Sequence, residues 1–486
     1  MKHKKQLQKQ WSGKKIGVWG YGKVGKSVIR LLLKKKAILE LFDNRVLNKR
    51  EKIYIDKHKI SIAFHKENFL THNDILIASP GIALKDLYQK YDPKWLAELD
   101  LFAQLFHKKI IAITGTVGKT STTTLLSDIL SALGEKIVTG GNIGIPCLRL
   151  LSRQKKIAHA ILEVSSAQLA YTRIFTPDIA VITNLSPNHL DWHGTWKDYV
   201  YAKCAPLFRQ QEHQHAIMPL SFKEWIYQCG QPTGTCSFFI DRRPENTEIA
   251  SIGNHETLFY IARNKSVIQN ERASQTISAR KALSTRKALI VAYKSGVHTI
   301  LTSLDKLPDI TFDQNWVVLC AILYHMDIDP EKKLVPIVDR LAVPEHRLER
   351  CAVYNGVTIY NDSKSTTTLS TQAAVEQLHK YPIILILGGL SKGVDRSMFI
   401  SWLKDKIKLV CTFGNESQQL AAWCQENNIA VIALNTVSEA IRASIQNTVS
   451  GDCILFSPSG SSYDQFRDYE HRGRYFKKIV YSYINT

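Results

Sequence analysis

A short loop that combines glycines, hydroxyl side chains and one lysine has the composition of a phosphate-binding site. The loop is Thr114-Gly115-Thr116-Val117-Gly118-Lys119-Thr120-Ser121. Its glycines would let backbone N–H groups approach phosphate oxygens, Lys119 would neutralise the β- and γ-phosphates, and the Thr120 hydroxyl would contact Mg²⁺. A strict Walker A motif has a glycine five residues before Gly118, where this chain has Ile113. We therefore predict a nucleoside triphosphate site built on a variant loop.

A strand and a helix are expected on either side of this loop. The apolar run at residues 108–113 predicts a buried strand, and residues 122–133 have the spacing of a helix. A helix that begins at the loop presents its positive end to the phosphates. A glycine turn that only joins the strand to the helix is the structural alternative, and the loop alone does not separate ATP from GTP.

A second glycine-rich loop, Gly20-Tyr21-Gly22-Lys23-Val24-Gly25, follows a strand-like run at residues 16–19. A helix-like run at 27–33 and a strand-like run at 38–42 then lead to Asp43. This G-x-G-x-x-G loop with a later acid is typical of a dinucleotide site in a βαβ unit. An NAD-dependent oxidoreductase and a βαβ turn without a ligand are both open interpretations of this segment.

Two polar clusters at the ends of later strand-like runs supply candidate metal ligands. Glu163 lies near the end of the run at residues 158–164, and His189 lies in the cluster that follows the run at 178–183. Because the carboxyl ends of parallel strands share one edge of a sheet, we expect both side chains beside the phosphate loop. A carboxylate and an imidazole suit Mg²⁺. A surface acid and a structural histidine are the alternatives.

The last third of the chain carries polar clusters with the charges that phosphoryl transfer needs. Arg347 lies in Glu345-His346-Arg347-Leu348-Glu349, and Lys364 lies in Asn361-Asp362-Ser363-Lys364-Ser365-Thr366-Thr367, directly after a strand-like run at residues 357–360. An arginine and a lysine placed in this way could clamp a transferring phosphoryl group. Taken singly, each cluster also fits a solvated loop.

Composition limits the class of protein. With 486 residues, 44% hydrophobic and 22% charged, the chain is long enough for several domains and is globular. The formal charge of +21 is spread along the chain, without a zinc-finger or RNA-binding motif, so no nucleic-acid partner is expected. The nine cysteines show no metal-ligand spacing and no apolar run has the length of a membrane span. We expect a cytoplasmic protein with reduced thiols.

The alternation of strands and helices predicts an α/β fold in three domains. We place these domains at residues 1–103, 104–343 and 344–486. The first and third are expected to be Rossmann-like, and the central one to be a P-loop domain with a mostly parallel sheet. Short β-like runs and basic stretches occupy residues 210–305, and no function is assigned to them.

In combination, these motifs resemble the Mur ligases of peptidoglycan synthesis. The shared features, in chain order, are Ser79-Pro80-Gly81-Ile82, the TGT-x-GKTS loop, GGNIG (140–144), LEVSS-x-QL (162–169), N-x-S-x-x-HLD-x-HG (184–194), HR-x-E (346–349), NDSK (361–364), and SP…S…DQF…EHRG (457–473). The order extends along nearly the whole chain. Within the family, NDSK, the Ser79–Ile82 loop and the glycine-rich first domain are similar to those of members that join D-glutamate to UDP-N-acetylmuramoyl-L-alanine.

The resemblance implies an ATP site with bound Mg²⁺. The ATP-binding residues would be Gly115, Thr116, Val117, Gly118, Lys119, Thr120, Ser121, Asn315, Arg347 and Asp362. The metal ligands would be Thr120, Glu163, His189 and Lys203, and Lys203 matches a lysine that the family carries as a carbamate. The catalytic group would be Lys119, His189, Lys203, Arg347 and Lys364.

The resemblance also implies that the first domain holds the UDP part of the substrate. The substrate-binding residues would be Tyr21, Gly22, Lys23, Asp43, Arg45, Gly81 and Asn142 for the UDP-sugar, and Thr366, Lys392, Ser462 and the backbone of Tyr469 for D-glutamate. Ser165, or Ser166 in its place, would bind substrate near the metal ligands. The expected protein is a monomeric cytoplasmic ligase of cell-wall synthesis, with these small molecules as partners.

Several positions depart from the family pattern. The family tends to place two asparagines on the helix that contacts adenine, whereas this chain has Asn315 and Val318. Thr367 stands where an asparagine is usual, and Ser459-Gly460-Ser461 replaces alanine–cysteine–alanine. A sibling ligase that adds another amino acid, an NAD-dependent oxidoreductase and a nucleic-acid-binding NTPase remain the alternatives to the proposed activity.

Overall fold

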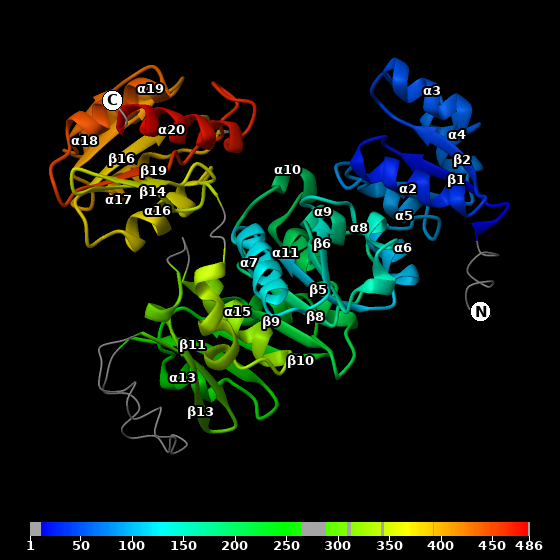
Figure 1. Ribbon diagram of the computed structural model, residues 1–486. Helices are drawn as coiled ribbons and strands as arrows, with labels where there is room; N and C mark the ends of the chain where they lie inside the picture. Colours follow the sequence, from blue (N-terminus) through cyan, green and yellow to red (C-terminus); the bar gives the residue numbers. More distant parts are fainter. Residues whose placement is uncertain (1–10, 264–287, 309–312, 342–344, 392, 485–486) are drawn as a thin grey trace. The chain divides into compact units, whose positions relative to one another are not determined.

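The fold is known from a computed structural model that describes residues 11–263, 288–308, 313–341, 345–391 and 393–484 (Figure 1). The chain forms two compact units. The first comprises Met1–Leu304 and Val317–Leu341, and the second comprises Asp305–Trp316 and Ala342–Thr486. Two of the three β-sheets lie in the first unit and one lies in the second. Each predicted domain contains one sheet, which confirms the α/β class, while the domain boundaries stay a prediction.

The first sheet is parallel throughout and has the strand order β3-β2-β1-β4. Its strands and helices are β1 (Lys15–Trp19), α2 (Lys23–Lys34), β2 (Ile38–Phe42), α3 (Lys49–Lys57), β3 (Ser61–Ile62), α4 (Lys66–His72), β4 (Ile75–Ala78) and α5 (Asp86–Lys90). The predicted strand–loop–helix–strand order is confirmed. The helix begins at Lys23, inside the glycine motif, so the motif supplies the first turn of α2.

The central sheet has nine strands in the order β13-β12-β11-β10-β9-β8-β5-β7-β6. Its elements begin with α6 (Glu98–Leu105), β5 (Lys109–Thr114), α7 (Lys119–Ala132), β6 (Ile137–Gly141), α8 (Cys147–Leu150), β7 (His159–Glu163), α9 (Ser166–Leu169), β8 (Ile179–Ile182), α10 (Leu190–His193) and α11 (Trp196–Cys204). The strands from β6 to β11 run parallel, as predicted, and β12 and β13 add an antiparallel edge.

The stretch at 210–305, to which no function was assigned, extends this sheet. It supplies β9 (His215–Pro219), α12 (Lys223–Cys229), β10 (Thr235–Ile240), α13 (Asn246–Ala250), β11 (Thr257–Ala262), β12 (Leu289–Lys294) and β13 (Val297–Ser303). Strands β10 and β11 are the two β-like runs seen in the sequence. The helix α15 (Gln314–His325) follows.

The third sheet has six strands in the order β14-β15-β19-β16-β17-β18, of which only the β14–β15 pair is antiparallel. Its elements are β14 (Glu349–Tyr354), β15 (Val357–Asn361), α16 (Thr368–Gln377), β16 (Ile383–Gly388), α17 (Ser397–Trp402), β17 (Leu409–Phe413), α18 (Ser417–Glu426), β18 (Val431–Ala433), α19 (Val437–Gln446), β19 (Cys453–Phe456) and α20 (Tyr469–Ile484). The strand predicted at residues 357–360 is confirmed as β15.

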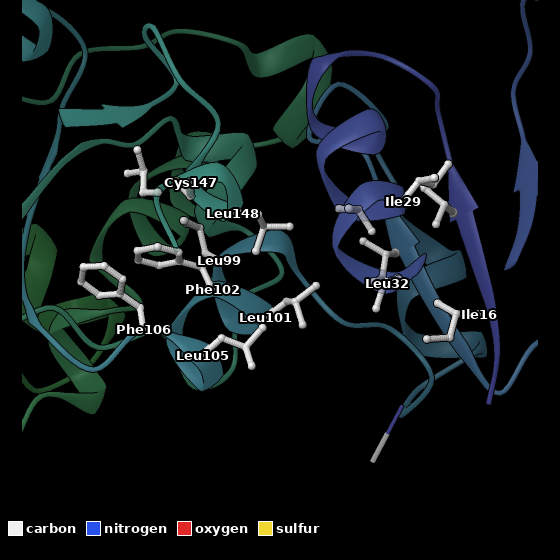
Figure 2. Close-up of a cluster of buried hydrophobic side chains, with 14 of the residues drawn as sticks. Ile16, Ile29, Leu32, Leu99, Leu101, Phe102, Leu105, Phe106, Cys147 and Leu148 are labelled. Atoms are coloured by element: carbon white, nitrogen blue, oxygen red, sulfur yellow. The ribbon is translucent and has the colours of Figure 1, made fainter. Parts of the chain in front are cut away.

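Buried apolar side chains connect the elements within the first unit. Figure 2 shows Leu99, Leu101, Phe102 and Leu105 of α6 with Phe106, Cys147 and Leu148 at one side, and Ile16, Ile29 and Leu32 of β1 and α2 at the other. The rings of Phe102 and Phe106 stack with their centroids 4.6 Å apart. Burial of such side chains is the main stabilising contribution in this part of the fold.

Two other sequence expectations can be compared with the structure. All nine cysteines are unpaired, and seven of them are buried. Among the described residues, the helices are all too short or too polar to cross a lipid bilayer.

Replacement of Phe102 by alanine should destabilise the first unit by about 3–5 kcal/mol, because it removes a fully buried, stacked ring and leaves a cavity. Thermal and urea unfolding would measure the change. The matched control is Phe64→Ala, since that ring is 85% exposed and its loss should change stability little. Equal effects of the two substitutions would contradict this account of the core.

Candidate functional site

The phosphate loop joins β5 to α7 in the way the sequence predicts. Gly115 and Gly118 have φ values of +142° and +84°, which L side chains rarely adopt. A Cβ atom on Gly115 would lie 2.0 Å from Thr183 Oγ1. Glycine at this position therefore allows the loop to pack directly against the end of β8.

The residues that follow β8 hold the loop in shape. Asn184 Oδ1 accepts hydrogen bonds from the backbone N–H groups of Thr116 (3.1 Å) and Val117 (2.9 Å), and Asn184 Nδ2 donates to the Val117 carbonyl (3.0 Å). Thr183 Oγ1 also donates to the Val117 carbonyl, at 2.6 Å. These contacts fix the loop conformation without a ligand.

Two lysines meet at one carbonyl of this loop. Lys119 Nζ donates to the carbonyl oxygens of Gly115 (2.8 Å) and Thr116 (2.9 Å). Lys203 Nζ donates to the Gly115 carbonyl (2.9 Å) and to Thr114 Oγ1 (3.1 Å). Lys203 is only 2% exposed, and burial together with the charge of Lys119 lowers its pKa well below the ordinary value. Burial and the neighbouring Lys119 therefore both favour the neutral amine form of Lys203 over its ammonium form.

Glu163, at the end of β7, has a carboxylate suited to a cation. Its Oε1 accepts a hydrogen bond from Asn142 Nδ2 at 2.8 Å, whereas Oε2 is buried and has no hydrogen-bond partner in the described chain. Since β5 pairs with β7 and Ile113 lies opposite Glu163, this carboxylate is beside the phosphate loop. A buried, unpartnered carboxylate oxygen needs a positive partner, and the donor set fits Mg²⁺.

The histidines of the segment after β8 differ in their surroundings. His189 is exposed, has a φ of +52° and precedes α10. His193 is half-buried, its Nε2 lies 2.9 Å from Ser166 Oγ, and burial and the charge of Lys203 lower its pKa to about 4. Among the described residues, no group of three or more His, Cys, Asp and Glu side chains could hold a metal; the predicted set also uses Thr120 and Lys203.

The first glycine loop is organised by two carboxylates. Asp43 accepts hydrogen bonds from the backbone N–H groups of Tyr21 (2.6 Å) and Arg45 (2.9 Å). The Arg45 guanidinium donates to the Tyr21 carbonyl and pairs with both oxygens of Glu51 at 3.0 Å. Hydrogen bonds from Arg45 and Lys26 lower the pKa of Glu51 to about 2. The Asp43 carboxylate therefore stabilises the loop conformation by accepting hydrogen bonds from backbone N–H groups.

In the second unit, Asp362 organises the loop after β15. Its Oδ1 accepts a hydrogen bond from the Leu348 N–H (3.0 Å), and its Oδ2 accepts from Ser365 Oγ (2.5 Å) and Ser457 Oγ (2.8 Å). Complete burial raises the pKa of Asp362 to about 6 in spite of these donors. The carboxylate thereby connects the segment just before β14 with the segments that follow β15 and β19.

Ser363 and Lys364 of the same loop contact the first turn of α20. Ser363 Oγ donates to the Tyr469 carbonyl at 2.9 Å, and Lys364 Nζ lies 3.5 Å from the centroid of the Tyr469 ring. Arg472, which is fully buried, donates to Ser363 O (2.7 Å) and to the Gly460 carbonyl (3.0 Å). The loop predicted to contact the phosphoryl group and the segments predicted to contact the amino acid are thus adjacent.

Comparison with known proteins agrees with this geometry. The chain matches the Mur ligase MurD-like N-terminal domain over residues 14–90, the Mur ligase middle domain over 113–279, and the Mur ligase glutamate ligase domain over 346–460. A UDP-N-acetylmuramoylalanine–D-glutamate ligase of Koribacter versatilis is 30% identical over 96% of this chain and 97% of its own length. The protein of that name from Lawsonia intracellularis is 30% identical over 98% and 96%.

The chain belongs to the Mur ligase family. As a Mur ligase, it is an ATP-dependent enzyme that forms amide bonds. Solved structures share its fold: a Thermotoga maritima MurF ligase in complex with ADP has a TM-score of 0.56 at 14% identity, covering 98% of this chain and 97% of that one. The UDP-N-acetylmuramate–alanine ligase MurC of the same organism has a TM-score of 0.56 at 14% identity, covering 97% and 100%.

Not every predicted site residue of this Mur ligase has a described environment. Lys392 lies outside the described residues. Asn315 is buried in the first turn of α15, and Val318 is completely buried, so the position of the missing second asparagine is part of the core. Ser462 is buried, whereas Arg347 and Thr366 are partly exposed. Ser165 caps α9, where its hydroxyl bonds to Gln168. The roles given to these residues stay predictions.

The NAD-dependent oxidoreductase is not supported for this Mur ligase. Residues 14–90, which include the glycine loop, match a Mur ligase domain. Both oxygens of Asp43, the acid that would bind a ribose, are used by backbone N–H groups of Tyr21 and Arg45.

Two functional candidates were missed from sequence, Asn184 and His193. Both lie in the segment at 184–194, where His189 was the predicted metal ligand. The strand pairing shows which residues Asn184 and His193 contact.

Substitution of Gly115 by alanine should weaken binding of a non-hydrolysable ATP analogue about tenfold or more, because the new Cβ forces the loop away from Thr183. Isothermal titration calorimetry would measure the affinity. The control is Gly253→Ala, where the nearest atom lies 3.6 Å from the new Cβ and φ is not positive. An unchanged affinity in Gly115→Ala would show that this loop is not the nucleotide site.

Proposed function

We propose that this Mur ligase joins D-glutamate to the L-alanyl carboxylate of UDP-N-acetylmuramoyl-L-alanine, with hydrolysis of ATP to ADP and phosphate. The proposal is supported by the match of residues 14–90 to the MurD-like N-terminal domain and by curated relatives of that name along the whole chain. The structural observation that carries it is the buried Lys203, which bonds to the phosphate loop beside Lys119 and has a pKa well below its ordinary value.

The chemistry requires two steps because a carboxylate is a poor electrophile. In the first, an oxygen of the alanyl carboxylate attacks the γ-phosphorus of ATP, which gives an acyl phosphate and ADP. In the second, the deprotonated amine of D-glutamate attacks the acyl carbon, the C–O bond to the phosphate breaks, and phosphate leaves. All of the substrates are anions, so the protein acts mainly by positioning them and by balancing their charge.

The ATP site of this proposal is the phosphate loop. Its backbone N–H groups and Lys119 bind the phosphates, and Arg347 and Lys364 contact the transferring phosphoryl group. Asp362 holds the loop that carries Lys364 through its bonds to Ser365 and Leu348. Mg²⁺, held by Thr120, Glu163, His189 and Lys203, would supply positive charge at the β- and γ-phosphate oxygens.

Lys203 can join this set as a carbamate. Its neutral Nζ keeps a lone pair that adds to the carbon of CO₂, and loss of one proton gives an anion with two oxygens. Such a group is a suitable ligand for Mg²⁺, whereas a lysine ammonium is not. The lowered pKa of Lys203, caused by burial and by Lys119, favours the amine that this addition needs.

The remaining assignments concern the other substrates. We assign the UDP-sugar to Tyr21, Gly22, Lys23, Asp43, Arg45, Gly81 and Asn142, and D-glutamate to Thr366, Lys392, Ser462 and the backbone of Tyr469. Ser165 would bind substrate near the metal ligands. The loops after β1 and β4 lie together, since Ser79 Oγ donates to the Gly20 carbonyl at 3.2 Å. The enzyme would act as a monomer in the cytoplasm, in peptidoglycan precursor synthesis and thus in cell division and cell shape.

Phosphate release should require ATP, UDP-N-acetylmuramoyl-L-alanine and D-glutamate together, because the acyl phosphate forms on one substrate and is consumed by the other. A coupled phosphate assay with each component omitted in turn would show this. L-alanine, L-lysine and diaminopimelate replace D-glutamate as controls. Turnover with one of these and none with D-glutamate would identify a sibling ligase, and ATPase activity that depends only on DNA or RNA would refute the proposal.

Lys203→Ala should lower turnover about 10²- to 10³-fold, with partial recovery on addition of short carboxylic acids that replace the carbamate oxygens. Steady-state kinetics with and without added acetate or propionate would measure both effects. Lys197→Ala is the matched control, because Lys197 is an exposed lysine on the same helix, α11. Turnover at the wild-type level in Lys203→Ala would remove the carbamate from the proposed function.

A further inference from the structure

The ammonium group of Lys364 is in unusually close contact with an aromatic ring. Its Nζ lies 3.5 Å from the centroid of the Tyr469 ring. The other contacts between a cationic side chain and a ring that the described residues form have distances of 4.5–5.8 Å. The face of an aromatic ring carries partial negative charge, so a cation at this distance is attracted to it.

The backbone on both sides of this contact is fixed. Ser363 Oγ donates to the Tyr469 carbonyl (2.9 Å), and Arg472 donates to Ser363 through Nε (3.1 Å) and Nη2 (2.7 Å). Two consecutive residues therefore contact Tyr469: Ser363 bonds to its carbonyl, and Lys364 lies against its ring. The Lys364 N–H also donates to the His346 carbonyl at 3.0 Å.

The position of the ring itself is determined by close packing of α20. The rings of Tyr469 and His346 meet edge to face, with centroids 6.5 Å apart and planes at 80°. One turn further along α20, a Cβ atom on Gly473 would lie 2.3 Å from His346 Nδ1. The missing side chain at Gly473 thus lets α20 approach His346, which places the Tyr469 ring where Lys364 can reach it.

We propose that Tyr469 is a positioning residue for phosphoryl transfer, whose aromatic ring holds the Lys364 side chain in place. The inference deepens the proposed function and rests on it. A lysine has four rotatable bonds, so a fixed contact reduces the entropy that it loses when it meets the phosphoryl group. Because the backbone of the same residue is assigned to D-glutamate, Tyr469 would link the amino-acid site to the phosphoryl site.

The test separates the charge of the ring face from its shape. Tyr469 is replaced by phenylalanine and by phenylalanines that carry one, two and three ring fluorines, which weaken the negative face stepwise at nearly constant shape. Tyr469→Phe is the reference for the series, because it keeps the ring face and removes the hydroxyl, which donates to Glu470 at 3.2 Å. Across the fluorinated series kcat should fall progressively, by about 2- to 30-fold in total, with little change in KM.

A second measurement needs no substrate. Acetic anhydride acylates lysine side chains that it can reach, so weakening the contact with the ring should speed acetylation of Lys364, read by mass spectrometry at fixed pH. The same series at Tyr381, which has Lys380 5.2 Å from its centroid, is the control and should leave turnover unchanged.

The outcomes distinguish the two proposals. A flat series in either measurement, or a loss in Tyr469→Phe as large as in the trifluorinated variant, overturns the positioning role. Failure of the wild-type enzyme to release phosphate with UDP-N-acetylmuramoyl-L-alanine and D-glutamate would refute the proposed function, whereas the acetylation series would still report whether the ring holds Lys364.

Discussion

The Gly115 carbonyl receives hydrogen bonds from two lysine side chains, and the arrangement of the phosphate loop depends on that shared acceptor. Lys119 and Lys203 donate to it at 2.8 and 2.9 Å. Burial and the positive charge of Lys119 both disfavour the ammonium form of Lys203, so the pKa of Lys203 lies well below its ordinary value. The loop must expose this carbonyl to both lysines, which requires the glycine conformation at residue 115 and the support of Thr183 and Asn184.

The strand order brings these groups together. Strand β5 lies between β7 and β8, so Glu163, the phosphate loop and the segment with His189 and His193 all leave the same edge of one parallel sheet. The second unit uses the same principle, because the loops after β15, β16 and β19 leave neighbouring strands. The predicted site residues are concentrated at these edges because parallel strands present their carboxyl ends, with successive loops, on one side.

Local pattern was enough to predict the strands next to the candidate sites (β1, β2, β5, β7, β8 and β15), the phosphate loop and the α/β class, because each depends on residues that are close in sequence. Contacts that depend on strand pairing could not be predicted from the sequence. Asn184 supports Thr116 and Val117 only because β8 pairs with β5, and no sequence spacing specifies that neighbour. Likewise, His193 meets Ser166 across the sheet edge. The NDSK loop was identified by composition, but its attachment to Tyr469 and Arg472 spans more than a hundred residues.

The burial of Asp362 makes folding of the second unit a proton-linked equilibrium. Its pKa is about 6 in the folded protein, above the ordinary 3.8, so the folded state binds a proton more tightly than the unfolded chain does. The contribution of this proton to the free energy of unfolding is complete below about pH 4, where Asp362 is protonated in both states, and it is lost as the pH rises through about 6. At neutral pH the ionised carboxylate costs the fold about 3 kcal/mol, at about 1.4 kcal/mol for each pKa unit. The unit therefore gives up stability to keep a charged acceptor beneath the loop that carries Lys364.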